Sequence, residues 1–235
     1  MSGERRISLA FGALYLITFV TSISALILFQ PVLDDPQGYI AGAGEDNRIY
    51  FGVLLEPFLI IANLGTALVL IPLLKRQHEI LTFSYVAARI MECVFILVGI
   101  LAVLAVVTLR QDSPDAGVLA ESFAAIKDWT FKLGPGFVVG IGNGFILGYL
   151  MYRSGLMPRG LTWLGMVGGP IQSVVGIFVV FGVFDAGAGV QGILTIPEII
   201  WEFSLGIYPL IWGFRSSPIL SEEGRVTLQP ALEAR

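Results

Sequence analysis

The sequence predicts an all-α membrane protein, a bundle of six transmembrane helices. Of its 235 residues, 55% are hydrophobic and only 14% are charged, and the mean hydropathy is +0.81. This composition is typical of membrane chains and not of soluble ones. The length leaves little room for a separate soluble domain. We therefore expect one transmembrane domain over residues 1–214 and a polar, loosely ordered tail over residues 215–235.

The apolar segments approach or exceed the roughly 18 residues that mark a membrane span. The first, Ile7–Phe29, is too long for a removable signal peptide and lacks a small-residue cleavage site, so we expect it to remain as an anchor. The other expected spans are Tyr50–Leu74, Ile80–Leu109, Phe137–Tyr152, Leu161–Phe184 and Ile193–Phe214. The fourth is slightly short unless Pro135 begins its helix, where a missing N–H costs nothing.

A mixed polar stretch separates the third and fourth spans. Within it, Leu119, Phe123 and Ile126 recur at helical spacing, while Glu121 and Asp128 face elsewhere. An apolar stripe of this kind predicts a short amphipathic helix that lies on the membrane surface before the fourth span.

The basic residues near the spans predict the orientation, since cytoplasmic loops hold an excess of Lys and Arg. With six spans, both termini lie on one side. That side carries Arg5, Arg6, Lys75, Arg76, Arg153, Arg159 and Arg215. The opposite side is rich in acidic residues, and its basic residues are Arg48, Arg110, Lys127 and Lys132. We therefore expect a plasma membrane protein with both termini in the cytoplasm.

Small residues recur at every fourth position in two of the spans. In the fourth span they are Gly136, Gly140, Gly144 and Gly148, and in the fifth they are Gly165, Gly169 and Ser173. Stripes of this kind let helix backbones approach closely within a bilayer. We expect these two spans to pair with each other, or the stripe Gly136, Gly140, Gly144 and Gly148 to form a homo-oligomer.

The last span, which contains TIPEIIWEFSLGIY, carries two glutamates one helical turn apart, Glu198 and Glu202. They share a helix face, and we treat them as candidate catalytic residues and as candidate ligand- or proton-binding residues. Other polar or aromatic side chains of the spans complete this candidate binding set: Glu56, Asn63, Tyr85, Arg89, Glu92, Asn143 and Trp201.

Energetics favours convergence of these charges, because one charge at the centre of a membrane helix costs about 2.5–3.5 kcal/mol. Arg89 can neutralise one carboxylate, whether Glu202, Glu56 or Glu92. The other glutamates are then protonated, line a hydrated cavity or bind a cation. An ion pair that only holds helices together would explain Arg89 and one glutamate. It does not explain the three other glutamates of the spans, which have no base.

Absent features exclude several classes of protein. The formal net charge of −4 and the pI near 5.0 argue against a nucleic-acid partner. No expected span contains a lysine, which excludes a retinal Schiff base, and the only histidine, His78, lies at a membrane edge. A carboxylate site for Mg²⁺, Ca²⁺ or Mn²⁺ is only weakly indicated. We expect no metal and no cofactor; the expected partners are membrane lipid and a small ligand.

Three segments carry a resemblance to a known family. They are GALYLITFV, MYRSGLMPRGLTWLGMVGGP and PEIIWEFSLGIYPLIWGFRSSPI. They resemble the bacterial membrane family catalogued as domain of unknown function 4386, over essentially the whole chain. The most specific part lies in the last span: Pro197, Glu198, Trp201, Glu202, Ser204, Leu205, Gly206 and Tyr208. The resemblance implies a multi-spanning membrane protein, but it supplies no reaction and no catalytic residue.

Three functions fit these observations. We favour a protein that binds or transports a small cationic or amphipathic ligand or protons, with helices broken at Pro57, Pro170 and Pro197 around the site. The second is an intramembrane enzyme that acts on a lipid or isoprenoid, with Glu198 and Glu202 as acid and base. The third is a non-catalytic assembly subunit that associates through its glycine stripes.

Overall fold

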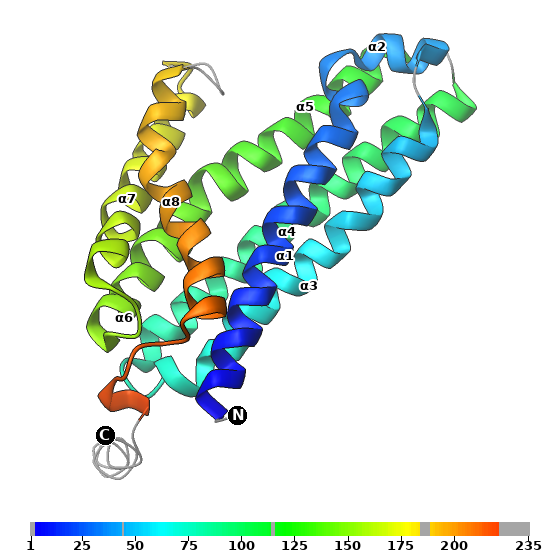
Figure 1. Ribbon diagram of the computed structural model, residues 1–235. Helices are drawn as coiled ribbons and strands as arrows, with labels where there is room; N and C mark the ends of the chain where they lie inside the picture. The colour runs from blue at the N-terminus through cyan, green and yellow to red at the C-terminus, as the bar shows by residue number, and fades with distance from the viewer. Residues whose placement is uncertain (1–2, 44, 114–115, 184–188, 221–235) are drawn as a thin grey trace.

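The computed structural model describes residues 3–43, 45–113, 116–183 and 189–220, and every element within them is helical (Figure 1). The elements are α1 (Gly3–Asp34), α2 (Pro36–Gly38), η1 (Tyr39–Ala43), α3 (Asp46–Leu74), α4 (Glu79–Asp112), α5 (Gly117–Leu133), η2 (Gly134–Val138), η3 (Gly140–Ile146), α6 (Leu147–Ser154), α7 (Arg159–Val180), α8 (Gly189–Ile211) and η4 (Pro218–Leu220). Six helical segments of the described chain are long and apolar enough to cross a membrane. The chain is therefore a multi-pass helical membrane protein, as predicted.

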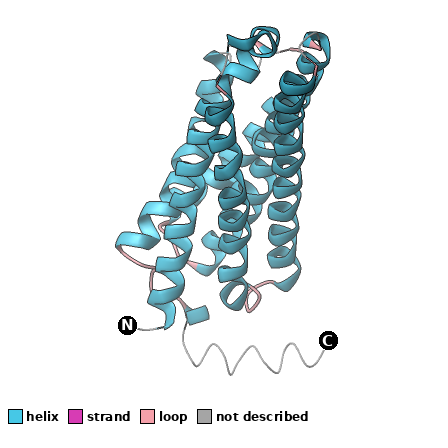
Figure 2. Ribbon diagram, turned by 90° about the vertical axis from the view of Figure 1, so that its right-hand side faces the viewer, coloured by secondary structure: helices cyan, strands magenta, loops and turns pink. Residues whose placement is uncertain are grey.

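The long helices run side by side along one axis (Figure 2). α1 packs along α3 on one side and against α8 on the other, while α4 lies between α3 and α5. α7 packs against α8 and η3. Figure 1 shows α8 (orange) close to α1 (blue) near the end that carries the N-terminus, and the two helices diverge toward the opposite end.

The predicted surface helix exists as α5, but it is not separate from the fourth span. Gly117–Ser154 is one helical segment that crosses the bundle. α5 lies along α4 and buries its small residues Ala120 and Ala124, while Leu119 and Ile126 are exposed. Small residues allow close approach to α4, so α5 packs within the bundle with Leu119 and Ile126 outward, while Phe123 packs against the core around Phe29.

The centre of this long segment is π-helical over η2 and η3. Pro135 lacks an N–H, and four glycines from 136 to 144 weaken the helix further. A π-helical turn shifts the backbone pairing and exposes carbonyl groups, which membrane proteins satisfy with side chains from neighbouring helices. Three such bonds form here: Gln172 Nε2 to Pro135 O at 2.6 Å, Ser173 Oγ to Phe137 O at 3.1 Å and Trp201 Nε1 to Asn143 O at 2.8 Å.

The prediction of broken helices at three prolines was wrong. Pro57 lies inside α3, Pro170 inside α7 and Pro197 inside α8, and each helix continues through its proline. Membrane helices tolerate proline where neighbouring groups satisfy the freed backbone. The irregular backbone of the described spans falls instead in η2 and η3.

The glycine stripe of the fourth span packs against α7 within the same chain, which confirms the predicted pairing of the fourth and fifth spans. A Cβ atom on Gly140 would lie 2.5 Å from the carbonyl oxygen of Gly169, and one on Gly144 would lie 2.5 Å from the Cα of Gly169. Only glycine permits this approach. Association of two chains through the same stripe remains a prediction.

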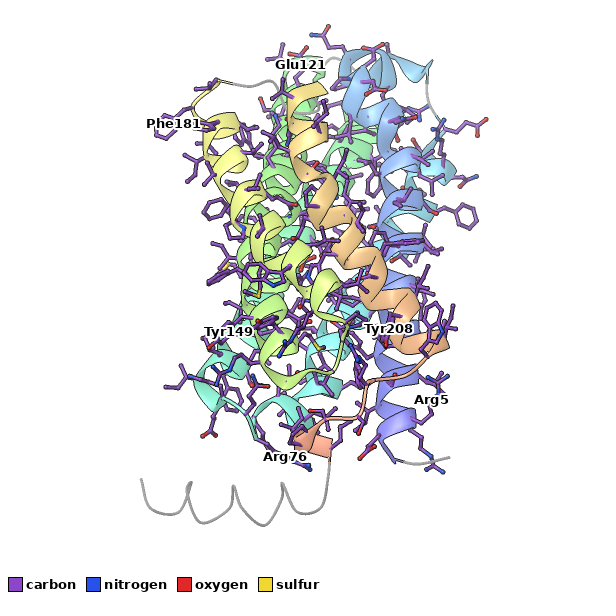
Figure 3. All side chains as sticks on the ribbon, turned by 60° about the vertical axis from the view of Figure 1, so that its left-hand side comes forward. Arg5, Arg76, Glu121, Tyr149, Phe181 and Tyr208 are labelled. Atoms are coloured by element: carbon purple, nitrogen blue, oxygen red, sulfur yellow. The ribbon has the colours of Figure 1, made fainter. Side chains whose placement is uncertain are left out.

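The two ends of the bundle differ as the charge pattern predicts. Arg5 and Arg76 lie near the end where the chain begins, whereas Glu121 and Phe181 lie at the other (Figure 3). The N-terminal end of α1 and the C-terminal η4 are therefore at one end of the bundle; their cytoplasmic location remains a prediction. The expected polar tail begins in packed structure, because Ile219 is buried and its carbonyl accepts a hydrogen bond from Arg76. Residues 221–235 lie outside the described residues.

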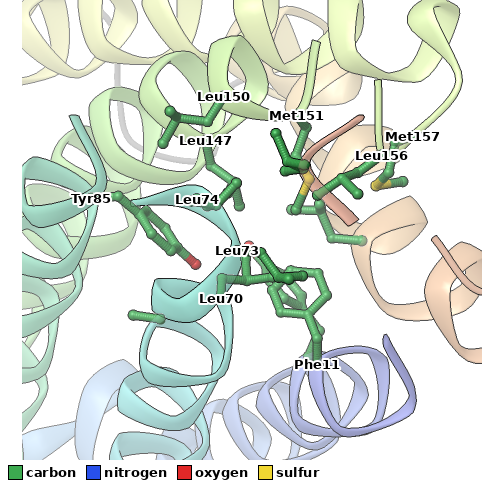
Figure 4. Close-up of a cluster of buried hydrophobic side chains, with 14 of the residues drawn as sticks. Phe11, Leu70, Leu73, Leu74, Tyr85, Leu147, Leu150, Met151, Leu156 and Met157 are labelled. Atoms are coloured by element: carbon green, nitrogen blue, oxygen red, sulfur yellow. The ribbon is translucent and has the colours of Figure 1, made fainter. Parts of the chain in front are cut away.

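Two apolar cores stabilise the two ends. The first is drawn in Figure 4 and joins α1, α3, α4 and α6 through side chains that include Phe11, Leu70, Leu74, Leu147 and Met151. Tyr85, a candidate binding residue, points into this core. The second core surrounds Phe29, Val32, Ile49, Val103 and Val106 near the opposite end.

Candidate functional site

A cavity of about 430 Å³ lies among α1, α3, α4, α5 and α8. Five residues of the predicted binding set line it: Glu56, Asn63, Arg89, Glu92 and Glu202. Four others do not: Tyr85, Asn143, Glu198 and Trp201. The volume falls within the roughly 300–1,000 Å³ of small-molecule sites. The predicted convergence of charged spans therefore occurs, for part of the set.

Arg89 forms its ion pair with Glu92, one of the three partners that the sequence allowed. Arg89 Nη1 donates to Glu92 Oε2 at 2.7 Å, and the guanidinium also donates to Thr66 Oγ1 at 3.0 Å and 3.3 Å. Asn63 Nδ2 donates to the other Glu92 oxygen at 3.0 Å. The Arg89 guanidinium carbon lies 5.3 Å from the ring centre of Tyr15. Every charge of this group is thus satisfied by neighbours on α1, α3 or α4.

A second ion pair was missed from the sequence. Lys127 Nζ on α5 donates to Glu56 Oε1 on α3 at 2.5 Å, and both side chains are less than 10% exposed. The ammonium also lies 4.8 Å from the ring centre of Phe29. The statement that no span contains a lysine was therefore wrong, and so was the expectation that three glutamates of the spans have no base.

The reason for the error is the placement of α5. Lys127 was assigned to a surface stretch, but Ala120, Ala124 and Lys127 share one helix face, at i, i+4 and i+7, and that face is buried. Two alanines in line with a lysine are a sequence signal for a close helix contact, and this signal could have placed Lys127 inside the bundle.

Glu202 lines the cavity, but its carboxylate forms no ion pair with a described basic side chain. Its Oε1 accepts hydrogen bonds from Tyr15 Oη at 3.2 Å and from Asn143 Nδ2 at 2.8 Å. Both donors are neutral. Of the ion pairs formed by the described residues, none includes Glu202. An ionised Glu202 would therefore carry the uncompensated charge of the site.

Asn143 and Trp201 hold Glu202 in place from outside the cavity. Trp201 is completely buried on α8, and its indole N–H donates to the carbonyl oxygen of Asn143. That carbonyl belongs to the π-helical segment η3, so the bond fixes the backbone beside the Asn143 amide. The pair act as positioning residues: Trp201 orders Asn143, and Asn143 orients the carboxylate of Glu202.

Glu198 borders a different space from Glu202, although the two are one turn apart. It is 1% exposed and faces the glycine seam between η3 and α7, where a Cβ on Gly144 would lie 2.6 Å from its Oε1. Neither carboxyl oxygen has a hydrogen-bond partner among the described residues. The two candidate catalytic glutamates therefore do not face one cavity together. Across the described chain, no three His, Cys, Asp or Glu side chains gather as metal ligands would.

The fold and this cavity define a class: a multi-pass integral membrane protein with a charged cavity inside a helix bundle. The chain matches the family described as "Domain of unknown function (DUF4386)" over residues 10–213 and belongs to it, which confirms the resemblance read from the sequence. Neither a curated protein nor a solved structure is similar enough to match the chain.

Proposed function

We propose that this membrane protein binds a small amphipathic ligand in the cavity among α1, α3, α4, α5 and α8, and that Glu202 binds either a proton or the polar end of that ligand. The observation that carries the proposal is Glu202 itself: a carboxylate that lines a cavity of about 430 Å³ and has only neutral partners, Tyr15 and Asn143. In a membrane interior such a group is functional by default. A proton or a ligand can supply the missing charge.

The lining of the cavity supports an amphipathic ligand. Its polar residues on α3 and α4, among them Glu56, Arg89 and Glu92, are buried, whereas most of its exposed lining residues lie on α1, α5 and α8 and are apolar: Ile23, Leu26, Phe131 and Ile199, beside the one exposed acid Asp128. An apolar, exposed rim on a membrane helix bundle faces lipid tails. A ligand could therefore enter from the bilayer with its polar end toward Glu202.

No observation favours the enzyme hypothesis in the same way. An acid and base couple must reach the same reacting atoms, but Glu198 faces the glycine seam and Glu202 faces the cavity. The assembly hypothesis is less well supported, because Gly140, Gly144 and Gly148 pack on α7 of the same chain and are therefore not free to contact a second chain.

The test is a native mass spectrum of the gently purified protein beside Glu202→Gln and Asp128→Asn. We expect a co-purifying mass in the wild type and in Asp128→Asn, and its loss in Glu202→Gln. Asp128 is the matched control because it also lines the cavity, but it is exposed and pairs with Lys132.

A second variant tests the route of entry. Ile199→Trp fills the exposed rim without touching a polar residue, and it should also lose the bound mass. The same co-purifying mass in wild type, Glu202→Gln and Ile199→Trp would refute the proposal. Chemical conversion of an added lipid by the wild type but not by Glu198→Gln would replace it with the enzyme hypothesis.

A further inference from the structure

We infer that the ligand is a single-chain cationic amphiphile, an alkylammonium whose head group binds the free oxygen of Glu202 while its chain leaves the cavity between α1, α5 and α8. This inference rests on the proposed function and names the chemical class of its ligand. It follows from the charges, the hydrogen bonds and the shape of the cavity.

The charges of the cavity lining do not balance. Two bases line it, and each is paired: Lys127 with Glu56 and Arg89 with Glu92. Asp128 at the rim pairs with Lys132. Glu202 is the remaining acid. A neutral or anionic head group would leave an ionised Glu202 uncompensated, whereas one positive charge balances the site.

The hydrogen bonds of Glu202 leave one oxygen for such a head group. Tyr15 and Asn143 both donate to Oε1. Oε2 accepts no hydrogen bond from the described residues and is not among the fully buried oxygens that lack a partner. Glu202 is also the partly exposed acid of the site, whereas Glu56 and Glu92 are buried. An ammonium group at Oε2 would form a charge-assisted hydrogen bond without breaking either existing one.

An anionic head group fits the same cavity poorly. To bind it, Arg89 or Lys127 would have to release Glu92 or Glu56. Breaking a buried ion pair leaves an uncompensated charge and is strongly unfavourable. The two paired bases thus act against anionic amphiphiles, because the carboxylates beside them repel a second negative charge.

The apolar part of the cavity has room for one chain. Phe19, Leu59 and Ile96 form apolar walls beside the polar residues, and Ile23 and Ile199 continue them to the outer surface, where they are 54% and 53% exposed. A volume of about 430 Å³ is near the lower end of the small-molecule range. It suits one alkyl chain that extends into the bilayer, and not a complete two-chain lipid.

The experiment compares three amphiphiles with the same chain length: dodecylamine, dodecanol and dodecanoic acid. Each is added at the same mole fraction to neutral-lipid nanodiscs that hold the full chain at pH 7, and bound masses are counted by native mass spectrometry. We expect dodecylamine to bind about tenfold or more tightly than dodecanol, as one charge-assisted hydrogen bond allows. Dodecanoic acid should bind least.

Variants test separately whether the cavity binds an amphiphile and whether that amphiphile must be cationic. In Glu202→Gln the preference for dodecylamine over dodecanol should fall to about one, while Glu79→Gln, which changes an exposed acid outside the cavity lining, should keep it. If Glu202→Gln does not fold, Glu202→Asp replaces it and should weaken dodecylamine alone. Equal or tighter binding of dodecanoic acid would overturn the cationic ligand but leave an amphiphile site. Binding of none of the three, or equal binding in Ile199→Trp, would overturn the proposed function as well.

Discussion

Lys127 donates a hydrogen bond to Glu56 across 2.5 Å, although 71 residues separate them in the chain. α5 packs mainly along α4, and this bond ties it to α3 at the lining of the cavity. It also satisfies two charges that would each be costly within a bilayer.

Lys127→Met should lower the free energy of unfolding by about 3–5 kcal/mol, because it leaves the buried Glu56 without its base. Glu56→Gln combined with Lys127→Met should recover part of that loss, since neither charge then remains. The measurement is unfolding in a dodecyl sulfate titration, followed by tryptophan fluorescence.

Lys132→Met is the matched control for that experiment. Lys132 lies on the same helix, and its partner Asp128 is half exposed. An exposed pair contributes about 0–1 kcal/mol, so this variant should unfold close to the wild type. Equal losses for Lys127→Met and Lys132→Met would contradict the buried pair.

Glu198→Met and Glu202→Met should separate the two glutamates by stability. Glu198 forms no hydrogen bond among the described residues, so its replacement by a side chain of similar length should be neutral or stabilising. Glu202→Met leaves the donors of Tyr15 and Asn143 unsatisfied and should cost about 1–3 kcal/mol. A larger loss for Glu198→Met, measured in the same titration, would show that Glu198 has a partner that the structure does not describe.

Gly144→Ala should disrupt the seam between η3 and α7. Its Cβ would lie 2.5 Å from the Cα of Gly169 and 2.6 Å from Glu198 Oε1, so backbone must move. Overpacking of this kind costs typically 1–3 kcal/mol, and more where backbone blocks the site. Size-exclusion profiles and the unfolding titration would detect it.

Gly160→Ala provides the comparison for Gly144→Ala. Gly160 is also helical, but a Cβ there would meet no atom within 4 Å. Alanine is favoured over glycine in a helix by roughly 0.5–1 kcal/mol, so this variant should be as stable as the wild type or more stable. Similar behaviour of the two variants would argue against the close seam.

Binding of a permanently charged amphiphile, dodecyltrimethylammonium, should weaken as the pH falls. The sign follows from Glu202: lower pH favours its neutral form, which offers the cation no charge. Higher pH favours the carboxylate and tighter binding. In Glu202→Gln the affinity should be low and independent of pH. Affinity that rises on acidification would exclude Glu202 as the shared site of proton and cation.

The orientation can be tested with single cysteines, because the only native one, Cys93, is buried. Glu79 and Glu121 are both exposed and lie at opposite ends of the bundle. On intact cells an impermeant maleimide should label Glu121→Cys and spare Glu79→Cys until the membrane is opened. The reverse pattern would place both termini outside the cytoplasm.

The number of spans and the positions of the two glycine stripes were predictable, because each depends on residues within one segment. The candidate site was predictable in part. Glu56, Asn63, Arg89, Glu92 and Glu202 were identified because polar groups in apolar runs are conspicuous. The sequence left three candidate ion-pair partners for Arg89, namely Glu56, Glu92 and Glu202, because each can reach it in some arrangement of the helices.

Other features escaped because they depend on the register and angle of packed helices. Lys127 lies in a stretch too polar to stand out as a span, and only the packing of α5 on α4 places its ammonium beside Glu56. Tyr15 sits in an ordinary apolar run, and only the approach of α1 to α8 gives it a bond to Glu202. Neither contact can be recognised from the composition of the segment that contains it.

Membrane insertion and span number follow from the sequence alone, because transfer of a contiguous apolar segment into lipid depends on its own side chains. The roles of Glu198 and Glu202 do not. They are one turn apart on the same helix, yet one faces a seam of glycine backbone and the other faces the cavity. Tertiary packing made that distinction, because the surroundings of a side chain are set by the helices that pack against it.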